Sequence, residues 1–273
     1  MRGISLAALA LLSTSIATSS EPRTFLGFRL LDLEDQSVKW QSPAFGKPAS
    51  VTYAFATTAV TTPDARNCAK LLPPEQAYRR SKISDADFRR EAAAAFRMWE
   101  RAANISFREA DSPESADIVI GAQGEPVGRA FTNVALKAAT DVAGKRGTSA
   151  GNKVIARSLI CLNPRQPWKI GFDGNLDVYD LRYTLAHEIG HAIGLDHPSA
   201  AGELMSYRYD EKQKGLQPGD MRGAALLYGP RTPSRMAGRL PAAEDKAANA
   251  DDADRGWPFG IGEAAAKKKP ASR

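Results

Sequence analysis

The sequence predicts a mixed α/β fold for the central part of this 273-residue chain. Two observations point to strands: residues 51–55 alternate between apolar and small side chains, and several later runs are short and apolar. A third points to helices, because residues 85–103 carry apolar side chains at helical spacing. With 43% hydrophobic and 25% charged residues, the composition is that of an ordinary globular protein that can bury a sizeable core.

The segment before the first predicted strand is mixed in character and interrupted by residues that break regular structure. These are Pro22, Pro43, Gly46 and Pro48. We expect residues 20–48 to form an N-terminal arm that lies on the domain. After strand 51–55, a proline-containing loop follows that is longer than most connections.

The first predicted helix begins after Ser84, a residue type favoured at helix N-caps, and has Asp85 and Asp87 in its first turn. Its apolar residues form one stripe: Phe88, Ala92, Ala95, Phe96, Trp99 and Ala103. This stripe could line a ligand groove, but we interpret it as a core-facing surface, which is the commoner use of such a pattern.

Four short apolar runs follow and are predicted as strands: residues 105–107, 117–120, 128–134 and 153–162. A second helix is predicted from about residue 177 to Gly194. The last helix starts at Pro218-Gly219-Asp220 and stops at Gly229-Pro230.

All three histidines of the chain lie within the second of these helices and the turn after it. His187 and His191 are four residues apart, so a helix presents them on one face, where they can bind one metal ion. Gly194 can adopt the left-handed conformation that ends a helix, and the turn would bring His197 round as a third ligand. Three nitrogens and a water make a catalytic zinc site, whereas surface histidines would not gather at this spacing.

This window, His187-Glu188-Ile189-Gly190-His191-Ala192-Ile193-Gly194-Leu195-Asp196-His197, resembles the long zinc signature of the metzincin metallopeptidases. Met205, eight residues after His197, is similar to the methionine of the family's Met-turn. The short gap resembles the matrixin branch. The Met205-Ser206-Tyr207 sequence resembles the serralysin branch instead, although the calcium repeats of serralysins are absent.

The resemblance implies a zincin fold, with a twisted, mostly parallel five-stranded sheet, an antiparallel edge strand, an active-site helix and a C-terminal helix. It covers residues 49–230, which we take as the catalytic domain. Residues 216–229 resemble that domain's last helix, but Gly219 stands where matrixins often have the first of two aspartates. The salt bridge which that aspartate can make to a freed N-terminus is therefore in doubt.

The resemblance also assigns roles. One catalytic zinc lowers the pKa of its water and polarises the scissile carbonyl, while Glu188 acts as general base. Met205 packs beneath the imidazoles. Tyr207 either stabilises the oxyanion, as the tyrosine of serralysins does, or lines the pocket wall. Substrate should bind extended along an edge strand, for which residues 128–134 are the candidate.

A calcium site stays open as a second metal hypothesis. Asp173, Asn175 and Asp177 alternate like the start of a calcium loop, but no bidentate glutamate follows at the right distance. We favour a plain turn here. The second, structural zinc of vertebrate matrixins needs histidines that this chain lacks.

Cys68 and Cys161 are the two cysteines of the chain. Three states are considered: a disulfide, which we favour, two free thiols, or a latch in which one thiolate binds the zinc. Matrixins use such a latch within a Pro-Arg-Cys-Gly motif, and neither cysteine has that context.

Residues 1–19 are predicted to be a signal peptide, because Arg2 precedes an apolar run and small residues follow near Ala17. The run is much shorter than the roughly 20 residues needed to span a bilayer. We expect export, to the extracellular space or to a periplasm, and the matrixin resemblance associates the chain with the extracellular matrix. The tail, residues 231–273, is rich in Ala, Pro, Lys and Asp and is predicted to be disordered.

The expected function is therefore a secreted zinc-dependent endopeptidase with a protein or peptide substrate, acting as a monomer. The net charge of +6 is mild and not gathered into a basic stripe, so nucleic-acid binding is not expected. Two other classes were weighed: a zinc-bound binding module without catalysis, against which an intact Glu188 argues, and a cell-surface structural protein.

Overall fold

The computed structural model describes residues 24–25, 27–138, 152–199 and 201–231. The predicted signal peptide, residues 1–19, and the tail beyond Arg231 lie outside the described residues. Within the part that is described, no helix is both long and apolar enough to cross a membrane.

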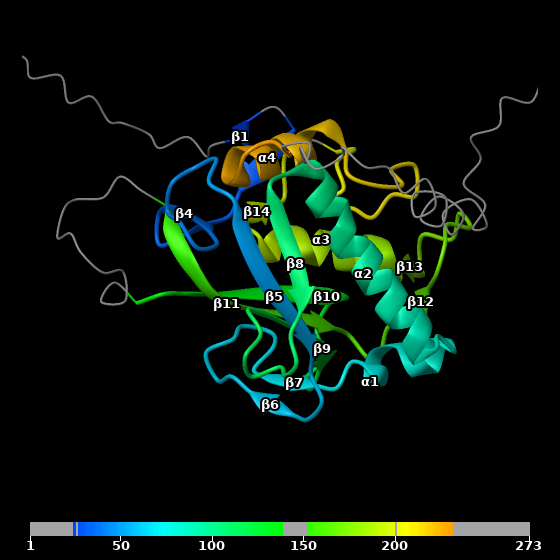
Figure 1. Cartoon of the computed structure of the whole chain (residues 1–273). Helices are drawn as coiled ribbons and strands as arrows, with labels where there is room; N and C mark the ends of the chain where they lie inside the picture. Colours follow the sequence, from blue (N-terminus) through cyan, green and yellow to red (C-terminus); the bar gives the residue numbers. More distant parts are fainter. Residues whose placement is uncertain (1–23, 26, 139–151, 200, 232–273) are drawn as a thin grey trace, which may run out of the picture.

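The centre of the fold is a twisted sheet whose strand order is β8-β5-β9-β11-β10 (Figure 1). The first four strands run parallel to their neighbours, and β10 pairs antiparallel with β11 at the edge. The predicted five-stranded, mostly parallel sheet with an antiparallel edge strand is therefore confirmed. Its strands are β5 (Ala49–Phe55), β8 (Ile105–Glu109), β9 (Ile118–Gln123), β10 (Ala130–Leu136) and β11 (Lys153–Leu162).

Strand β10 begins two residues later than the sequence predicts. Gly128 has a φ of +61°, in the left-handed region that glycine tolerates best, so the chain turns there before it can extend. The sequence bounds of β11 are confirmed at both ends.

Short strands extend this sheet beyond the prediction. β4 (Gln36–Lys39) runs parallel to the start of β11 and pairs with β3 (Asp32–Leu33). β7 (Lys70–Leu72) pairs with β9 and with β6 (Val60–Thr61). The predicted arm and the predicted long loop thus both contribute strands, which their irregular composition did not reveal. The loop ends in α1 (Glu75–Tyr78) and the 3-10 helix η1 (Arg79–Ser81).

Two smaller sheets complete the described structure. β1 (Thr24–Phe25), β2 (Phe28–Leu30) and β14 (Leu195–Asp196) form an antiparallel group, and β12 (Trp168–Lys169) pairs with β13 (Tyr179–Asp180). In the first group, residues from the beginning of the chain lie beside the segment that leads to His197.

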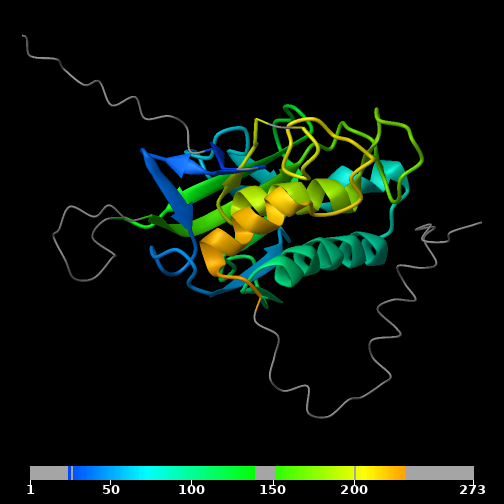
Figure 2. The same cartoon turned by 90° about the horizontal axis from the view of Figure 1, so that it is seen from above.

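Helices α2 (Asp85–Ala102) and α3 (Leu181–Ala192) lie side by side on one side of the sheet (Figure 2), and α4 (Pro218–Tyr228) contacts α2 and β2. Ser84 caps α2 as predicted, because its Oγ accepts a hydrogen bond from Asp87 N. The start predicted for α3, residue 177, is wrong by four residues. Asp180 is the N-cap, accepting from Tyr183 N, and β13 occupies the residues just before it.

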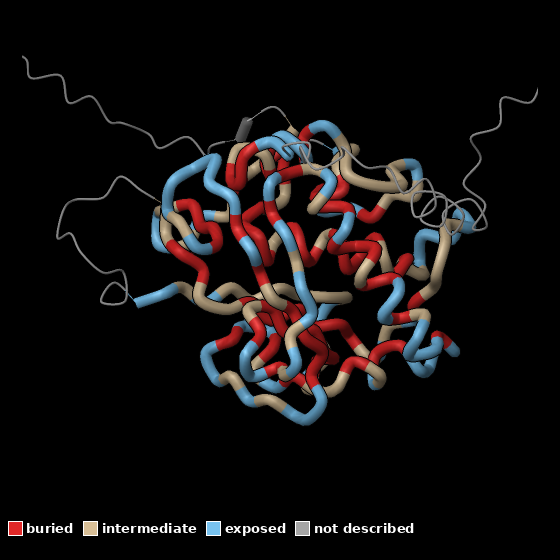
Figure 3. Tube along the Cα trace, viewed as in Figure 1, coloured by how far each residue is buried: buried red, intermediate tan, exposed pale blue. Residues whose placement is uncertain are grey.

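The core fills the space between the sheet and these helices (Figure 3). All six residues of the predicted stripe on α2 are buried, each at most 2% exposed, which confirms the core interpretation. Trp99 Nε1 donates to Ala186 O at 2.8 Å, so a buried polar group of α2 is satisfied by the backbone of α3. This contact fixes the helix that carries the histidines against the core.

Cys68 and Cys161 form a disulfide bond, so neither is a free thiol or a zinc latch. Cys161 lies in β11, and Cys68 lies just before β7. Both are buried in a second apolar cluster, on which Leu71, Val119 and Leu159 also pack.

Candidate metal centre

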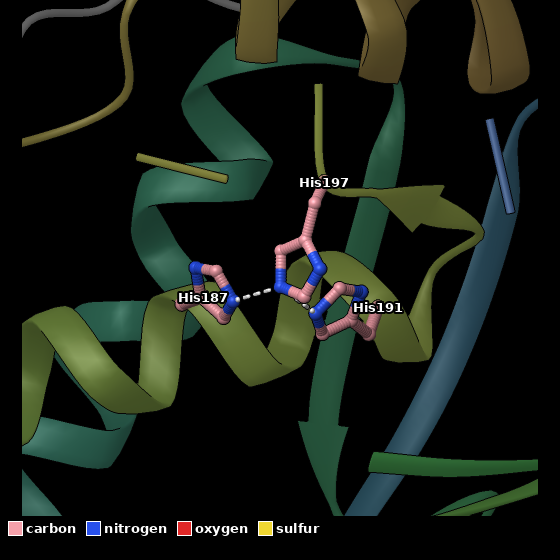
Figure 4. Close-up of side chains that lie close together, drawn as sticks. All are labelled: His187, His191 and His197. Carbon is pink, nitrogen blue, oxygen red and sulfur yellow. Dashed lines mark hydrogen bonds between the residues drawn. The ribbon is translucent and has the colours of Figure 1, made fainter. Parts of the chain in front are cut away.

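His187, His191 and His197 point toward one another, the first two from one face of α3 and the third from beyond β14 (Figure 4). The Nε2 atom of His197 lies 3.1 Å from that of His187 and 3.2 Å from that of His191. Gly194, at a φ of +104°, makes the turn that brings His197 back to the helix. The structure thus brings together the three residues that the sequence singled out.

Main-chain carbonyls fix two of the three imidazoles. His187 Nδ1 donates to Leu204 O at 2.9 Å, and His191 Nδ1 donates to Leu195 O at 2.8 Å. A carbonyl can only accept, so the proton of each neutral ring resides on Nδ1 and the Nε2 lone pair faces the centre. Burial lowers the pKa of His187 well below its usual value and that of His191 to about 4, which keeps both rings neutral.

The donor set fits a zinc ion. Nitrogens around a tetrahedral zinc with bonds of about 2.0–2.1 Å lie about 3.3–3.4 Å apart, close to the separations found here. The Nε2 lone pairs of His187 and His191 converge on His197 Nε2, which has at most one proton to share between them. A cation at the centre satisfies all three nitrogens. Within the described residues, these histidines are the group of three or more potential ligands whose donor atoms lie within 4.8 Å of one another.

Glu188 lines the same cavity as the histidines and is held by the edge strand. Thr132 Oγ1, on β10, lies 2.7 Å from Glu188 Oε2 and 2.9 Å from its main-chain oxygen. Burial raises the pKa of Glu188 to about 7, and the hydrogen bond from Thr132 acts in the opposite direction. A carboxyl group that titrates near neutral pH can both accept and return a proton.

Met205 packs against α3 at Gly190, between the positions of His187 and His191. It is 1% exposed, and a Cβ at Gly190 would meet Met205 Sδ at 2.2 Å. Asp220, at the start of α4, accepts hydrogen bonds from Leu204 N at 2.8 Å and Met205 N at 3.1 Å. The buried carboxylate therefore orients the segment that carries both Met205 and the carbonyl bonded to His187.

A cavity of about 310 Å³ opens beside the histidines. One wall is aromatic, with Tyr209 stacked on Tyr179 at 4.1 Å between ring centroids and perpendicular to Tyr183 at 4.9 Å. The Arg129 guanidinium lies 3.9 Å over the Tyr179 ring and donates to Asp177 O at 3.1 Å. Residues 128–131 of the edge segment also line the cavity.

Tyr207 also lines this cavity but is 82% exposed. Its ring stands perpendicular to the His197 ring, with 5.3 Å between centroids. Among the described residues its hydroxyl has no hydrogen-bond partner. This position is compatible with either role considered for Tyr207, so the oxyanion role stays a prediction.

The loop considered for calcium is instead held by a lysine. Lys169 Nζ donates to Asp173 Oδ1, to Asn175 O at 2.8 Å and to Glu211 Oε1 at 2.5 Å. Asp177 N donates to Asn175 Oδ1, as in a plain Asx turn. The ammonium group therefore engages two of the loop oxygens that a calcium ion would need.

Sequence analysis missed several residues of the site, among them Thr132, Arg129, Tyr209 and the carbonyls of Leu195 and Leu204. A threonine in a strand carries no signal that it will face a glutamate 56 positions away. The position of Tyr209 in the site could have been predicted from its closeness to Met205 in the sequence, because the segment after Met205 has to pass the metal centre.

Comparison with known proteins agrees with the geometry. A family model described as Matrixin matches residues 76–229. The chain is 31% identical to human matrix metalloproteinase-23 over 159 residues, 56% of this chain and 40% of that protein. It is 29% identical to metalloendoproteinase 1-MMP of Arabidopsis thaliana over 161 residues, 56% of this chain and 41% of that protein. The matched region thus spans about two fifths of the length of these curated relatives.

Proposed function

This chain belongs to the matrixin family of metalloendopeptidases, and we propose that it is an exported zinc-dependent endopeptidase whose general base is Glu188. The observation that carries the proposal is the convergence of three Nε2 atoms beside a buried carboxyl group. Matrixins are zinc enzymes, and the three histidines can bind that ion.

Zinc bound by the three histidines would supply a Lewis acid that polarises the scissile carbonyl and makes a water more acidic. Glu188 accepts the proton of the attacking water and then returns it to the leaving amine. Thr132 orients the carboxylate for both transfers, because its hydroxyl is anchored on the edge strand. The Leu204 and Leu195 carbonyls keep His187 and His191 in the tautomer that leaves Nε2 free.

Strand β10 supports an extended substrate. One of its edges pairs with β11, and its first residues form a rim of the cavity. A peptide that adds to the free edge would align its backbone by strand hydrogen bonds and place one side chain in the aromatic-walled cavity. This supports a protein or peptide substrate.

The disulfide supports export, because such bonds persist in oxidising compartments. The predicted signal peptide, residues 1–19, points the same way from the sequence alone. The extracellular space and a periplasm both satisfy this argument.

The decisive experiment compares the wild-type chain, Glu188→Ala and His197→Ala on denatured casein, with zinc content measured in each. Glu188→Ala should retain one zinc per chain and lose nearly all cleavage, whereas His197→Ala should lose most of both. Glu109→Gln, which changes an exposed carboxylate on β8, is the control and should match wild type. Cleavage by Glu188→Ala at close to the wild-type rate would reject the base, and zinc binding without cleavage by wild type would favour a binding module.

A further inference from the structure

The beginning of the described chain pairs with the segment that leads to His197. β2 pairs antiparallel with β14, placing Arg29 opposite Asp196 and Leu30 opposite Leu195. Leu31 N donates to Gly194 O at 2.9 Å, so the pairing continues into the turn that ends α3. We call residues 27–31 the N-terminal clamp. In Figure 1 this part of the chain lies next to α4 and β14.

β14 is the segment on which two of the histidines depend. Leu195 O accepts from His191 Nδ1 at 2.8 Å, and Asp196 Oδ1 accepts from His197 N at 2.7 Å. The other oxygen of Asp196 lies 3.3 Å from Arg29 Nε. The clamp therefore contacts both the backbone that orients His191 and the carboxylate that orients His197.

The other end of the clamp packs on the segment before Met205. A Cβ at Gly27 would meet Glu203 Oε1 at 2.6 Å, and Gly27 has a φ of +83°, so this position requires glycine. A Cβ at Gly219 would lie 2.1 Å from Gly27 O. Glu203 accepts from Gly219 N at 2.9 Å, which ties the same contact to the start of α4.

This close approach gives a physical reason for Gly219, where the sequence departs from the pair of aspartates. Any larger residue there would displace the clamp. The apolar side chains of the clamp are also buried, Phe28 at 7% exposed and Leu30 at 1%. The clamp thus joins two segments, β14 and residues 203–205, whose carbonyls hold the second and first histidine.

We propose that the N-terminal clamp is a positioning element of the metal centre, which holds His191 and His197 in ligand geometry. Arg29 acts through Asp196, and Gly27 acts through its contact with Glu203 and Gly219. This inference rests on the metal site of the proposed function. The proposal predicts that the affinity for zinc depends on Gly27 and Arg29. These residues contact none of the three histidines and lie about 160 positions before them in the sequence.

The test measures metal affinity in the full chain, without substrate. Zinc dissociation constants are determined by competition with a chromophoric chelator for wild type, Arg29→Ala, Arg29→Lys and Gly27→Ala. Arg89→Ala is the matched control, because Arg89 of α2 forms a comparable exposed ion pair with Glu109 of β8. Loss of a partner behind the ligands commonly weakens metal binding about 10–100-fold, and we expect about tenfold for Arg29→Ala and more for Gly27→Ala.

Two further results separate positioning from general destabilisation. Arg29→Lys keeps the positive charge and should recover most of the affinity, and the visible spectrum of the cobalt(II) form should change in Arg29→Ala but not in Arg89→Ala. Thermal unfolding of the metal-free proteins checks that each variant folds. Zinc affinities of Arg29→Ala and Gly27→Ala within about twofold of wild type would overturn the proposal. A wild-type chain that binds zinc tightly but cleaves no peptide would count against the endopeptidase alone, because the clamp is judged by the zinc affinities of the variants relative to wild type.

Discussion

The hydroxyl of Thr132 lies 2.7 Å from Oε2 of Glu188, joining the edge strand of the sheet to the candidate general base. The hydrogen bond stabilises the carboxylate against the burial that raises its pKa to about 7. Thr132 therefore links the strand on which substrate would bind to the carboxyl group that would transfer the proton.

Thr132→Val should lower kcat/KM about tenfold at neutral pH, the rate equivalent of about 1.4 kcal/mol and the lower range for a hydrogen bond to a charged group. The pKa of Glu188 should rise when this bond is lost, so the acid limb of the pH-rate profile moves to higher pH. Thr132→Ser keeps the hydroxyl and should retain the wild-type profile. Superimposable profiles for the Val and Ser variants would contradict the assignment.

Tyr207→Phe tests the role of the hydroxyl of Tyr207, whose ring stands perpendicular to that of His197. If the hydroxyl donates to the developing oxyanion, kcat should fall about 10²–10³-fold with little change in KM, which is the outcome we expect. Steady-state kinetics on one peptide measures both constants. A kcat within about twofold of wild type, with a shifted KM or side-chain preference, would instead identify a pocket-wall residue.

Lys169→Met should loosen the aromatic wall of the cavity. Lys169 bonds to Glu211, which accepts from Tyr209 OH at 2.8 Å, so the ammonium holds the wall in place through one carboxylate. We expect KM to rise roughly 3–10-fold, the equivalent of about 0.7–1.4 kcal/mol, while zinc affinity stays unchanged. Lys212→Met, which removes an exposed lysine beside Glu211, is the control. Equal KM values for the two variants would show that the network does not shape the cavity.

Lys39 should make stability depend on alkaline pH. Its side chain is buried and donates to Ser42 O at 2.7 Å, and burial lowers its pKa from 10.5 to about 8. Between these two values the unfolded state binds more protons, so the free energy of unfolding should increase as pH rises from about 8 to 10.5. Below about 8 both states carry the proton, so this group adds no further pH dependence there. We expect a difference on the order of 1–3 kcal/mol across this window.

Denaturant unfolding at several pH values measures this slope. Lys39→Met should flatten it, whereas Lys47→Met, which removes an exposed lysine, should leave it as in wild type. A slope that survives in Lys39→Met would assign the pH dependence to another group.

The disulfide should contribute about 3–5 kcal/mol to stability, because its half-cystines are 93 residues apart and a long loop loses much entropy on closure. Replacing both Cys68 and Cys161 by alanine should lower the free energy of unfolding by about that amount, measured by denaturant titration. Alkylation of the native protein should find no free thiol, and two modified cysteines would exclude the bond.

The sequence alone determined what depends on local spacing. His187 and His191 share a helix face because of the 3.6-residue period, and Gly194 supplies the backbone conformation that returns His197 to them. The stripe on α2 is buried for the same reason. The five-stranded sheet could be predicted because its strands lie in sequence runs long enough to show a pattern, and the family resemblance implied a mostly parallel sheet with an antiparallel edge strand.

The tertiary structure decided what depends on contacts between distant segments. Thr132 meets Glu188 only because β10, at the sheet edge, packs against α3, and Arg29 meets Asp196 only because a three-residue and a two-residue strand pair in one register. Strands as short as β2 and β14 have no periodicity of their own, so their pairing is set by the burial of neighbours such as Leu30 and by the close fit of glycine on glycine. The three histidines that could bind a metal are thus encoded locally, and the groups that position them are not.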